Sequence, residues 1–342
     1  MLDDLSFIHR IDKADALGIA AKEPDQLAYD FGFKADLDAI DNVVYTGMGG
    51  SALAASLSLT WPGFKVPFEV VRDYSLPAYV SGKTLCIVSS YSGNTEEALS
   101  ALNDAEQKGA QIVVITGGGK LLKLAQDKSY PIALLPQAKQ PRYAVFYNLK
   151  ALVEIGHQAG ILADDRPDLL ANSAAFLNEK LTAWLPERPT KDNLAKQIAL
   201  DCAGKSVVVY GGPKMAPAAY KWKISFNENG KHVAWVGVYS EFNHNEFIGW
   251  SNQPVDKPYC VIDLRSSLEH PQIQKRFELS ERLLSGRRPA PIVVQIEGDN
   301  IVDQLLGAVL LGDFVTLYSA IAAEINPEPV DLVEKFKVML NQ

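Results

Sequence analysis

Short runs of β-branched and aliphatic residues alternate with longer helical patterns from about residue 40 onward. Five runs in the first half have the length and composition of strands: NVVYTG, VPFEVVRD, TLCIVSSYS, AQIVVITGG and YPIALLP. Between them, SALAASLSLTW and TEEALSALNDAEQKG carry helix-forming residues at helical spacing. A chain that returns to a strand after each helix builds a parallel sheet wrapped by helices. The alternation therefore predicts an α/β fold.

A second series of the same kind follows the polar stretch AGILADDRPDLL. Its strand-like runs are SVVVYGG, PYCVIDLRS and PIVVQIEGD, again with helical segments between them. The chain has 342 residues, which exceeds one typical domain. We therefore expect two doubly wound, flavodoxin-like domains with parallel sheets. One would occupy residues 1–158 and the other residues 159–342, with the boundary within 158–168.

The charge balance and the cysteines narrow the class of protein. The 33 Lys and Arg residues against 41 Asp and Glu residues give a formal net charge of −8. Such an acidic chain is not expected to bind nucleic acid. The three cysteines are an odd number without C-x-x-C spacing, so they encode neither a disulfide framework nor a cysteine metal site. They fit a reducing cytosol.

Two segments bear on export and membranes. The first residues, MLDDLSFIHRIDKADALG, mix acids and bases and lack the apolar core of a signal peptide. The longest apolar stretch, residues 305–323, holds Asp313 near its middle. A buried helix of an α/β core explains this stretch better than an apolar membrane span of about 20 residues. We expect a cytoplasmic protein that makes no membrane contact.

A glycine loop follows the first predicted strand. Its sequence, GMGGSA at residues 47–52, leads directly into a helical pattern. Glycines at the end of a strand allow a tight turn, and the helix N-terminus offers unpaired N–H groups to an anion. The loop also satisfies a relaxed dinucleotide fingerprint, with Asp73 or Glu69 available as a ribose ligand. Taken alone, it fits an anion site, a nucleotide site or a structural turn.

A second loop, SSYSGNTEE at residues 89–97, is rich in hydroxyl groups. A structural interpretation uses Thr95 or Asn94 as a helix N-cap with acids in the first turn. That interpretation leaves the serine hydroxyls unexplained. Several hydroxyl donors suit a phosphate monoester, whereas a pyrophosphate is bound mainly by backbone N–H groups. We therefore expect a phosphorylated small molecule here. The glycines of TGGGK at residues 116–120 are by themselves more typical of a turn.

These two loops resemble those of the sugar isomerase (SIS) fold, whose members bind phosphosugars at such turns. Further segments are similar to the bifunctional phosphoglucose/phosphomannose isomerase family: QPR at 140–142, WKISFNEN at 222–229, EFNHNE at 241–246, Gly249-Trp250, GDFVTLY and INPEPVDLVEKFK. The resemblance covers nearly the whole chain from about residue 40. It implies interconversion of glucose 6-phosphate, and of mannose 6-phosphate, with fructose 6-phosphate, without a metal or nucleotide. It also implies a homodimer whose active site lies between subunits.

The resemblance also implies roles for individual residues. The phosphate-binding positions correspond to Gly49, Gly50, Ser51, Ser90, Ser92 and Thr95. Arg142 corresponds to the essential arginine, Glu228 to the base and His244 to the ring-opening histidine.

These three residue types match the chemistry of an aldose–ketose isomerase, which opens the pyranose ring and moves a proton between C1 and C2 through an enediolate. A carboxylate can move the carbon proton, an imidazole titrates near neutral pH, and a guanidinium can stabilise the enediolate or bind the phosphate. Without the resemblance, Glu228 fits a solvated acid at a helix end, His244 an exposed loop histidine and Arg142 an interdomain salt bridge. No ligand pair at helical spacing accompanies His244, which disfavours a metal site.

A C-terminal lysine completes the expected catalytic set. Both Lys335 and Lys337 fit the family pattern. At about 100° per residue, Lys337 falls between Val330 and Val333, whereas Lys335 lies toward Asp331. We therefore expect Lys337 to face inward and prefer it as the catalytic lysine, with Lys335 as the alternative.

Three other functions remain open at this point. A non-catalytic SIS protein that senses a phosphosugar would keep the serine loops but would not need the acid, the histidine and the arginine together. An aminotransferring ketose-phosphate isomerase is disfavoured because no glutaminase-like segment with an N-terminal cysteine precedes the first domain. A nucleotide-dependent oxidoreductase is the third alternative, and NADH binding would identify it.

Overall fold

Two compact units make up the computed structural model, which describes residues 1–252 and 258–340. One unit is Lys22–Phe176, and the other joins Met1–Ala21 to the chain from Leu177 onward. The chain passes from one unit to the other inside helix α7 (Arg166–Leu181), whereas the sequence pattern predicts a division at 158/159.

The first 21 residues pack with the C-terminal half of the chain. The Asp3 carboxylate accepts hydrogen bonds from the Thr190 backbone N–H at 2.7 Å and from Lys196 Nζ at 3.2 Å. Helix α2 (Ala16–Ala20) lies against helix α12 (Ile301–Ala322). Asp3 and Thr190 are 187 positions apart, so no local pattern reveals their contact.

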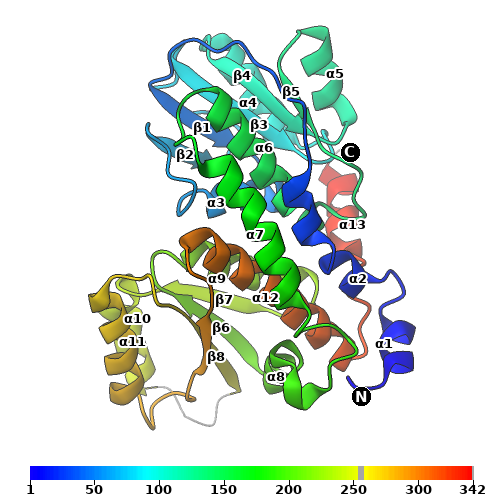
Figure 1. Ribbon diagram of the computed structural model, residues 1–342, viewed down its shortest axis with the longest axis vertical. Coiled ribbons are helices and arrows are strands. Elements are labelled where there is room, and N and C mark those ends of the chain that lie inside the picture. The colour runs from blue at the N-terminus through cyan, green and yellow to red at the C-terminus, as the bar shows by residue number, and fades with distance from the viewer. Residues whose placement is uncertain (253–257, 341–342) are drawn as a thin grey trace. The chain divides into compact units, whose positions relative to one another are not determined.

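The sheet of the unit Lys22–Phe176 has five parallel strands in the order β2-β1-β3-β4-β5. They are β1 (Asn42–Thr46), β2 (Phe68–Val71), β3 (Thr84–Ser90), β4 (Gln111–Thr116) and β5 (Ile132–Leu134) (Figure 1). All five strands expected in this half are present, and the prediction of a parallel α/β fold is confirmed. The order of the strands reverses between β1 and β3, which is where such sheets bind ligands.

Alternate residues of these strands point to opposite faces of the sheet. Val43 and Leu85 belong to one buried cluster, and their neighbours Val44 and Cys86 belong to another. The first cluster contains residues of α3 (Gly49–Leu57) and α6 (Val145–Gln158), and the second contains residues of α4 (Glu96–Gln107) and α5 (Gly119–Asp127). Helices therefore cover both faces of a sheet whose central strands are almost entirely buried.

The other unit has four parallel strands in the order β7-β6-β8-β9. They are β6 (Ser206–Gly211), β7 (Ala234–Val238), β8 (Tyr259–Ser266) and β9 (Ile292–Ile296). Right-handed crossovers place α9 (Ala216–Glu228) and α11 (Pro271–Leu283) on opposite faces of this sheet. Helix α12 packs beside α9 (Figure 1).

Helix α12 forms the centre of its unit. It is long and apolar enough to cross a membrane, but 89% of its most apolar stretch of 18 residues is buried inside the protein. The prediction of a buried helix for this stretch is confirmed. The remaining elements are α1 (Leu5–Ile11), α8 (Leu194–Asp201), α10 (Glu246–Gly249), α13 (Asp331–Leu340) and the 3₁₀ turns η1 (Glu23–Ala28), η2 (Pro141–Tyr143), η3 (Thr190–Asp192), η4 (Glu241–His244) and η5 (Trp250–Asn252).

Candidate active site

The glycine loop after β1 turns directly into the N-terminus of α3. Gly49 has φ +49°, a conformation that favours glycine, and no side chain caps this end of the helix. A Cβ atom on Gly50 would lie 2.9 Å from the carbonyl carbon of Pro141 and 3.1 Å from the backbone nitrogen of Arg142. The absence of a side chain at Gly50 therefore lets η2, which carries Arg142, approach the start of α3.

Arg142 is held in this place by the segment before β1. The carbonyl of Tyr143 accepts a hydrogen bond from Gln26 Nε2 at 2.6 Å, and Gln26 Oε1 accepts one from the Tyr147 N–H at 3.0 Å. Only 3% of Arg142 is exposed, and its guanidinium lies 5.0 Å from the centre of the Tyr143 ring. The fold thus brings the expected arginine to the glycine loop, 90 or more positions away in the sequence.

The hydroxyl loop after β3 forms its own network. The Ser90 and Thr95 hydroxyls are 2.8 Å apart, and Ser90 Oγ accepts a hydrogen bond from the Gly93 N–H at 3.1 Å. Ser92 Oγ accepts one from the Asn94 N–H at 3.3 Å. Thr95 occupies the N-cap position of α4, but its side chain does not cap the helix. The simple N-cap interpretation of Thr95 is therefore wrong, and the α4 N-terminus lies open beside three hydroxyl groups.

The two loops are joined at the point where the strand order reverses. Ser51, in the first turn of α3, is 5% exposed, and its hydroxyl accepts a hydrogen bond from the Tyr91 N–H at 2.9 Å. Its carbonyl accepts one from the Tyr45 hydroxyl at 2.7 Å. The expected phosphate-binding residues Gly49, Gly50, Ser51, Ser90, Ser92 and Thr95 therefore lie at the carboxyl ends of two neighbouring strands, together with Arg142.

The glycine turn at residues 116–120, which the sequence alone predicts to be only a turn, packs against the hydroxyl loop. Gly93 has φ +67°, and a Cβ atom there would lie 1.7 Å from the carbonyl oxygen of Gly118. Gly93 O accepts a hydrogen bond from the Leu121 N–H at 2.9 Å, and Asn94 Oδ1 accepts one from the Lys120 N–H at 3.2 Å. Sequence analysis missed Gly93 because this requirement arises from contact with another loop.

Gly93→Ala is expected to raise KM for a sugar phosphate about tenfold or more, because the new methyl group displaces the loop from the Gly118 turn. Gly109→Ala is the matched control. Gly109 has φ +69° in the same unit, but a Cβ atom there meets nothing within 4 Å. It carries the same backbone strain without the clash, so its KM should stay near that of the wild type. Equal KM values for the two variants would contradict this role of Gly93.

The corresponding turn of the second sheet is already occupied by an internal carboxylate. Glu269 Oε1 accepts hydrogen bonds from the backbone N–H groups of Lys214 at 2.8 Å and Met215 at 3.2 Å, just before α9. Burial raises the pKa of Glu269, and these two N–H groups oppose the rise. The glycines that end the run SVVVYGG therefore belong to a closed turn, and the loops expected to bind an anion belong to the unit Lys22–Phe176.

Glu228 is the last residue of α9 and is half-buried. The Lys231 ammonium, just beyond it, donates hydrogen bonds to the Glu228 carbonyl and to the Pro327 carbonyl, the latter at 2.8 Å. These bonds tie the C-terminal end of α9 to the segment that leads into α13. The structure therefore brings the start of the lysine-bearing helix to the end of the helix that carries the expected base.

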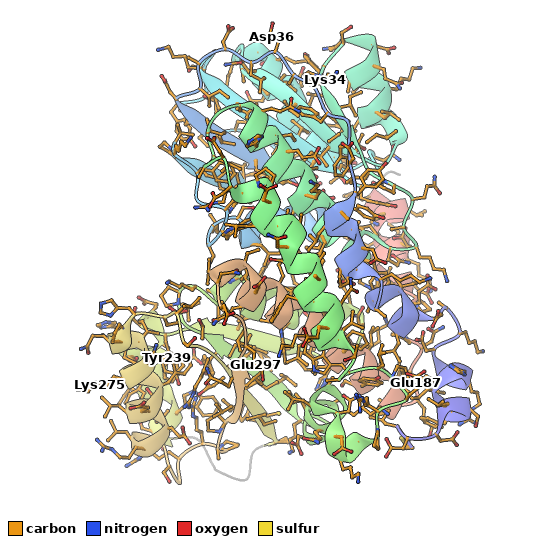
Figure 2. The ribbon with its side chains drawn as sticks, viewed as in Figure 1. Lys34, Asp36, Glu187, Tyr239, Lys275 and Glu297 are labelled. Atoms are coloured by element: carbon orange, nitrogen blue, oxygen red, sulfur yellow. The ribbon has the colours of Figure 1, made fainter. Side chains whose placement is uncertain are left out.

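His244 ends η4 and is exposed. Its segment is anchored by the aromatic packing of Tyr239, which Figure 2 labels. The centre of the Tyr239 ring lies 4.0 Å from that of the Phe277 ring of α11 and 4.9 Å from that of the Phe242 ring. The Arg288 guanidinium lies 5.7 Å from the Phe242 ring. Burial raises the pKa of Tyr239 to about 12, so this phenol stays protonated. The packed aromatic side chains thus support a segment that exposes His244 to solvent.

Glu228 and His244 lie on opposite faces of the same sheet. Glu228 ends α9, which covers one face. The segment of His244 packs on the other face, where Asn243 Nδ2 donates a hydrogen bond to Ser280 Oγ of α11 at 2.8 Å and Phe242 packs with Phe277. Within one unit the expected base and the expected ring-opening histidine are therefore not brought together.

The expectation that Lys337 faces inward is wrong. No residue of α13 is buried, and Lys337 Nζ lies 2.8 Å from Glu334 on the same helix. Lys335 is exposed as well. The helical projection assumed a neighbouring surface on the side of Val330 and Val333, and the described part of the chain places none there. Across residues 1–252 and 258–340, no three His, Cys, Asp or Glu side chains are grouped as metal ligands.

A parallel sheet wound by helices on both faces, with hydroxyl-bearing loops at its switch point, is the doubly wound fold that the resemblance to SIS proteins predicts. A crystal structure of a glucose-6-phosphate isomerase like protein from Thermus thermophilus has the same fold, with TM-score 0.65 and 18% identity over 98% of both chains. Residues 191–340 match the family described as bacterial phospho-glucose isomerase C-terminal SIS domain.

Two relatives of known family are similar to nearly the whole chain. The bifunctional phosphoglucose/phosphomannose isomerase of Caldicellulosiruptor bescii is 34% identical over 92% of this chain and 95% of its own length. The enzyme of the same name from Aquifex aeolicus is 31% identical over 90% of this chain and 92% of its own. The chain belongs to the family of bifunctional phosphoglucose/phosphomannose isomerases.

Proposed function

We propose that this protein interconverts glucose 6-phosphate and mannose 6-phosphate with fructose 6-phosphate. The observation that carries the proposal is the loop Ser90–Thr95, whose hydroxyls gather beside an uncapped helix N-terminus at the switch point of the sheet. Arg142 lies against the neighbouring loop at Gly50. Membership of the isomerase family supports the same substrate class.

The phosphate group positions the sugar. The hydroxyls of Ser51, Ser90, Ser92 and Thr95 and the N-terminal amides of α3 and α4 supply donors for its three terminal oxygens. Binding energy from this non-reacting end holds C1 and C2 in place for reaction. Unphosphorylated glucose is therefore expected to be a very poor substrate.

The chemistry has two steps. In ring opening, His244 donates a proton to the ring oxygen as its bond to C1 breaks, and recovers a proton from the O1 hydroxyl. In isomerisation, Glu228 removes the proton from C2 of the open aldose and returns it to C1, while a proton moves from O2 to O1. Arg142 stabilises the negative charge of the enediolate between these transfers. Lys337 or Lys335 is a further cation for this role.

A complete site requires two copies of the chain. Glu228 and His244 lie on opposite faces of one sheet, so the Glu228 of one protomer works with His244 of the partner subunit. The exposure of His244 fits this arrangement, because the imidazole remains accessible to a second molecule. We therefore propose a homodimer with the active site at the interface, acting in the cytoplasm without a metal or nucleotide cofactor.

The phosphosugar-sensing alternative is less well supported, because it does not explain the arginine that packs against the anion loop. A coupled assay separates the two functions. The purified protein should form fructose 6-phosphate from glucose 6-phosphate and from mannose 6-phosphate in the presence of a chelator, and should not act on glucose. Sugar-phosphate binding without turnover would favour a sensor. Tight NADH binding without phosphate-ester binding would favour an oxidoreductase.

A further inference from the structure

A buried polar network joins α9 to α12. Lys221 and Ser225 lie four residues apart on α9, and both face Asp313 in the middle of α12. Lys221 and Asp313 are each 1% exposed. None of these three side chains has a part in the chemistry proposed above, yet they lie on the helix that ends at Glu228 or against it.

The contacts within this network are specific. The Lys221 ammonium forms an ion pair with Asp313 and donates a hydrogen bond to Ser225 Oγ at 2.7 Å. Ser225 Oγ donates to Asp313 Oδ1 at 2.9 Å. One turn further, Asn229 Nδ2 donates to the Thr316 hydroxyl at 3.1 Å. The polar groups therefore follow the line of contact between the two helices up to the residue after Glu228.

The two helices also meet at a close apolar contact. The Trp222 indole N–H donates to the Ala308 carbonyl at 2.6 Å, and a Cβ atom on Gly312 would lie 2.4 Å from the Trp222 ring. A register shift by one helical turn, about 5.4 Å, would remove this contact and leave Lys221 and Asp313 buried without partners. The network therefore favours a single register of α9 on α12.

Stability alone is a weak explanation for such a network. Burying an ion pair costs desolvation free energy, whereas well-packed apolar side chains have no such cost. Asp313 Oδ2 is also buried without a hydrogen-bond partner among the described residues. The ion pair is therefore a poor source of stability, and it is better explained as a device that fixes the position of α9 on α12.

The geometry relates this position to Glu228. Glu228 follows Lys221 by seven residues, which is close to two full turns, so both lie on nearly the same side of α9. A small rotation or shift of the helix would displace the Glu228 carboxylate. Misplacement of a catalytic group by about 1 Å can lower a rate by about 100-fold.

We propose that Lys221, Ser225 and Asp313 are positioning residues that fix α9 on α12 and so place the Glu228 carboxylate for proton transfer. This inference rests on the proposed isomerase function and on Glu228 as its base. It assigns no contact with the substrate to any of the three residues.

The double variant Lys221→Met with Asp313→Leu tests the proposal, because it replaces the buried pair by apolar side chains and leaves no unpaired charge. We expect a melting temperature near that of the wild type, a kcat about tenfold lower or more, and a KM within about threefold, since the phosphate-binding residues belong to the other unit. With substrate deuterated at C2, the primary isotope effect on kcat should rise because proton transfer becomes more fully rate-limiting.

Lys196→Met with Asp3→Asn is the matched control. Lys196 is fully buried and ion-paired to Asp3 at 3.2 Å in the same unit, but it lies on α8 rather than on α9. This variant should lose stability and keep the wild-type kcat and isotope effect.

Ser225→Ala keeps the test decisive if the double variant does not fold. It removes the hydroxyl between the two charges and should lower kcat about threefold, again with an increased isotope effect. A wild-type kcat and isotope effect in either folded variant would overturn the positioning role. Absence of isomerase activity in the wild-type protein would instead refute the proposed function itself, so the two failures are distinguishable.

Discussion

Replacing Glu228 by glutamine is expected to lower kcat for glucose 6-phosphate isomerisation by about 1,000-fold, within the range contributed by a general base. The amide has the size of the carboxylate but cannot accept the C2 proton. The affinity for the sugar phosphate should change less than about threefold, because the loops proposed to bind the phosphate belong to the other unit. A coupled assay measures the first quantity, and calorimetric titration with fructose 6-phosphate measures the second.

Glu278→Gln is a suitable control for this substitution. Glu278 is an exposed glutamate on α11, away from the end of α9, and its replacement removes the same charge. The control should keep full activity. Turnover above about one tenth of the wild-type rate in Glu228→Gln would remove Glu228 from the role of base.

Much of the candidate anion site could be predicted from the sequence because its parts are local. Each loop directly follows a strand that its own composition reveals, and parallel strands end at the same edge of the sheet. Residues Ser51 and Ser90 therefore come together for reasons visible in short segments. The same is true of α12, whose long apolar pattern predicts a buried helix.

Features that depend on distant contacts could not be predicted in this way. The position of the first 21 residues depends on bonds such as that between Asp3 and Thr190, which are 187 positions apart. The partner of Lys221 is Asp313, 92 positions away, and neither short segment indicates the other. The prediction for Lys337 fails because periodicity identifies a helical face but not whether anything packs against it.

The arrangement of Glu228 and His244 shows why topology was needed to interpret the catalytic residues. In the sequence they are only 16 positions apart, a spacing that is compatible with a single cluster. The structure inserts strand β7 between them and places one on each face of the sheet. The topology of one unit thus favours the site shared between two copies of the chain that the resemblance implies.

A heterodimer of a Glu228→Gln chain and a His244→Ala chain is therefore expected to recover activity that both parent homodimers lack. If each site takes its glutamate from one protomer and His244 of the partner subunit, one site of the heterodimer contains both substitutions and the other contains neither. The heterodimer should then show about half of the wild-type activity per dimer. Each parent should remain near or below about one hundredth of it.

Two affinity tags on coexpressed chains allow the heterodimer to be purified away from both parents, and gel filtration verifies its size. A heterodimer of wild-type and Glu228→Gln chains, made with the same tags, serves as the control and should also have about half of the wild-type activity. If both residues of a site came from one chain, every site of the Glu228→Gln and His244→Ala heterodimer would lack one of them. Its activity would then stay at the level of the parents, and the shared site would be refuted even though the isomerase function stood.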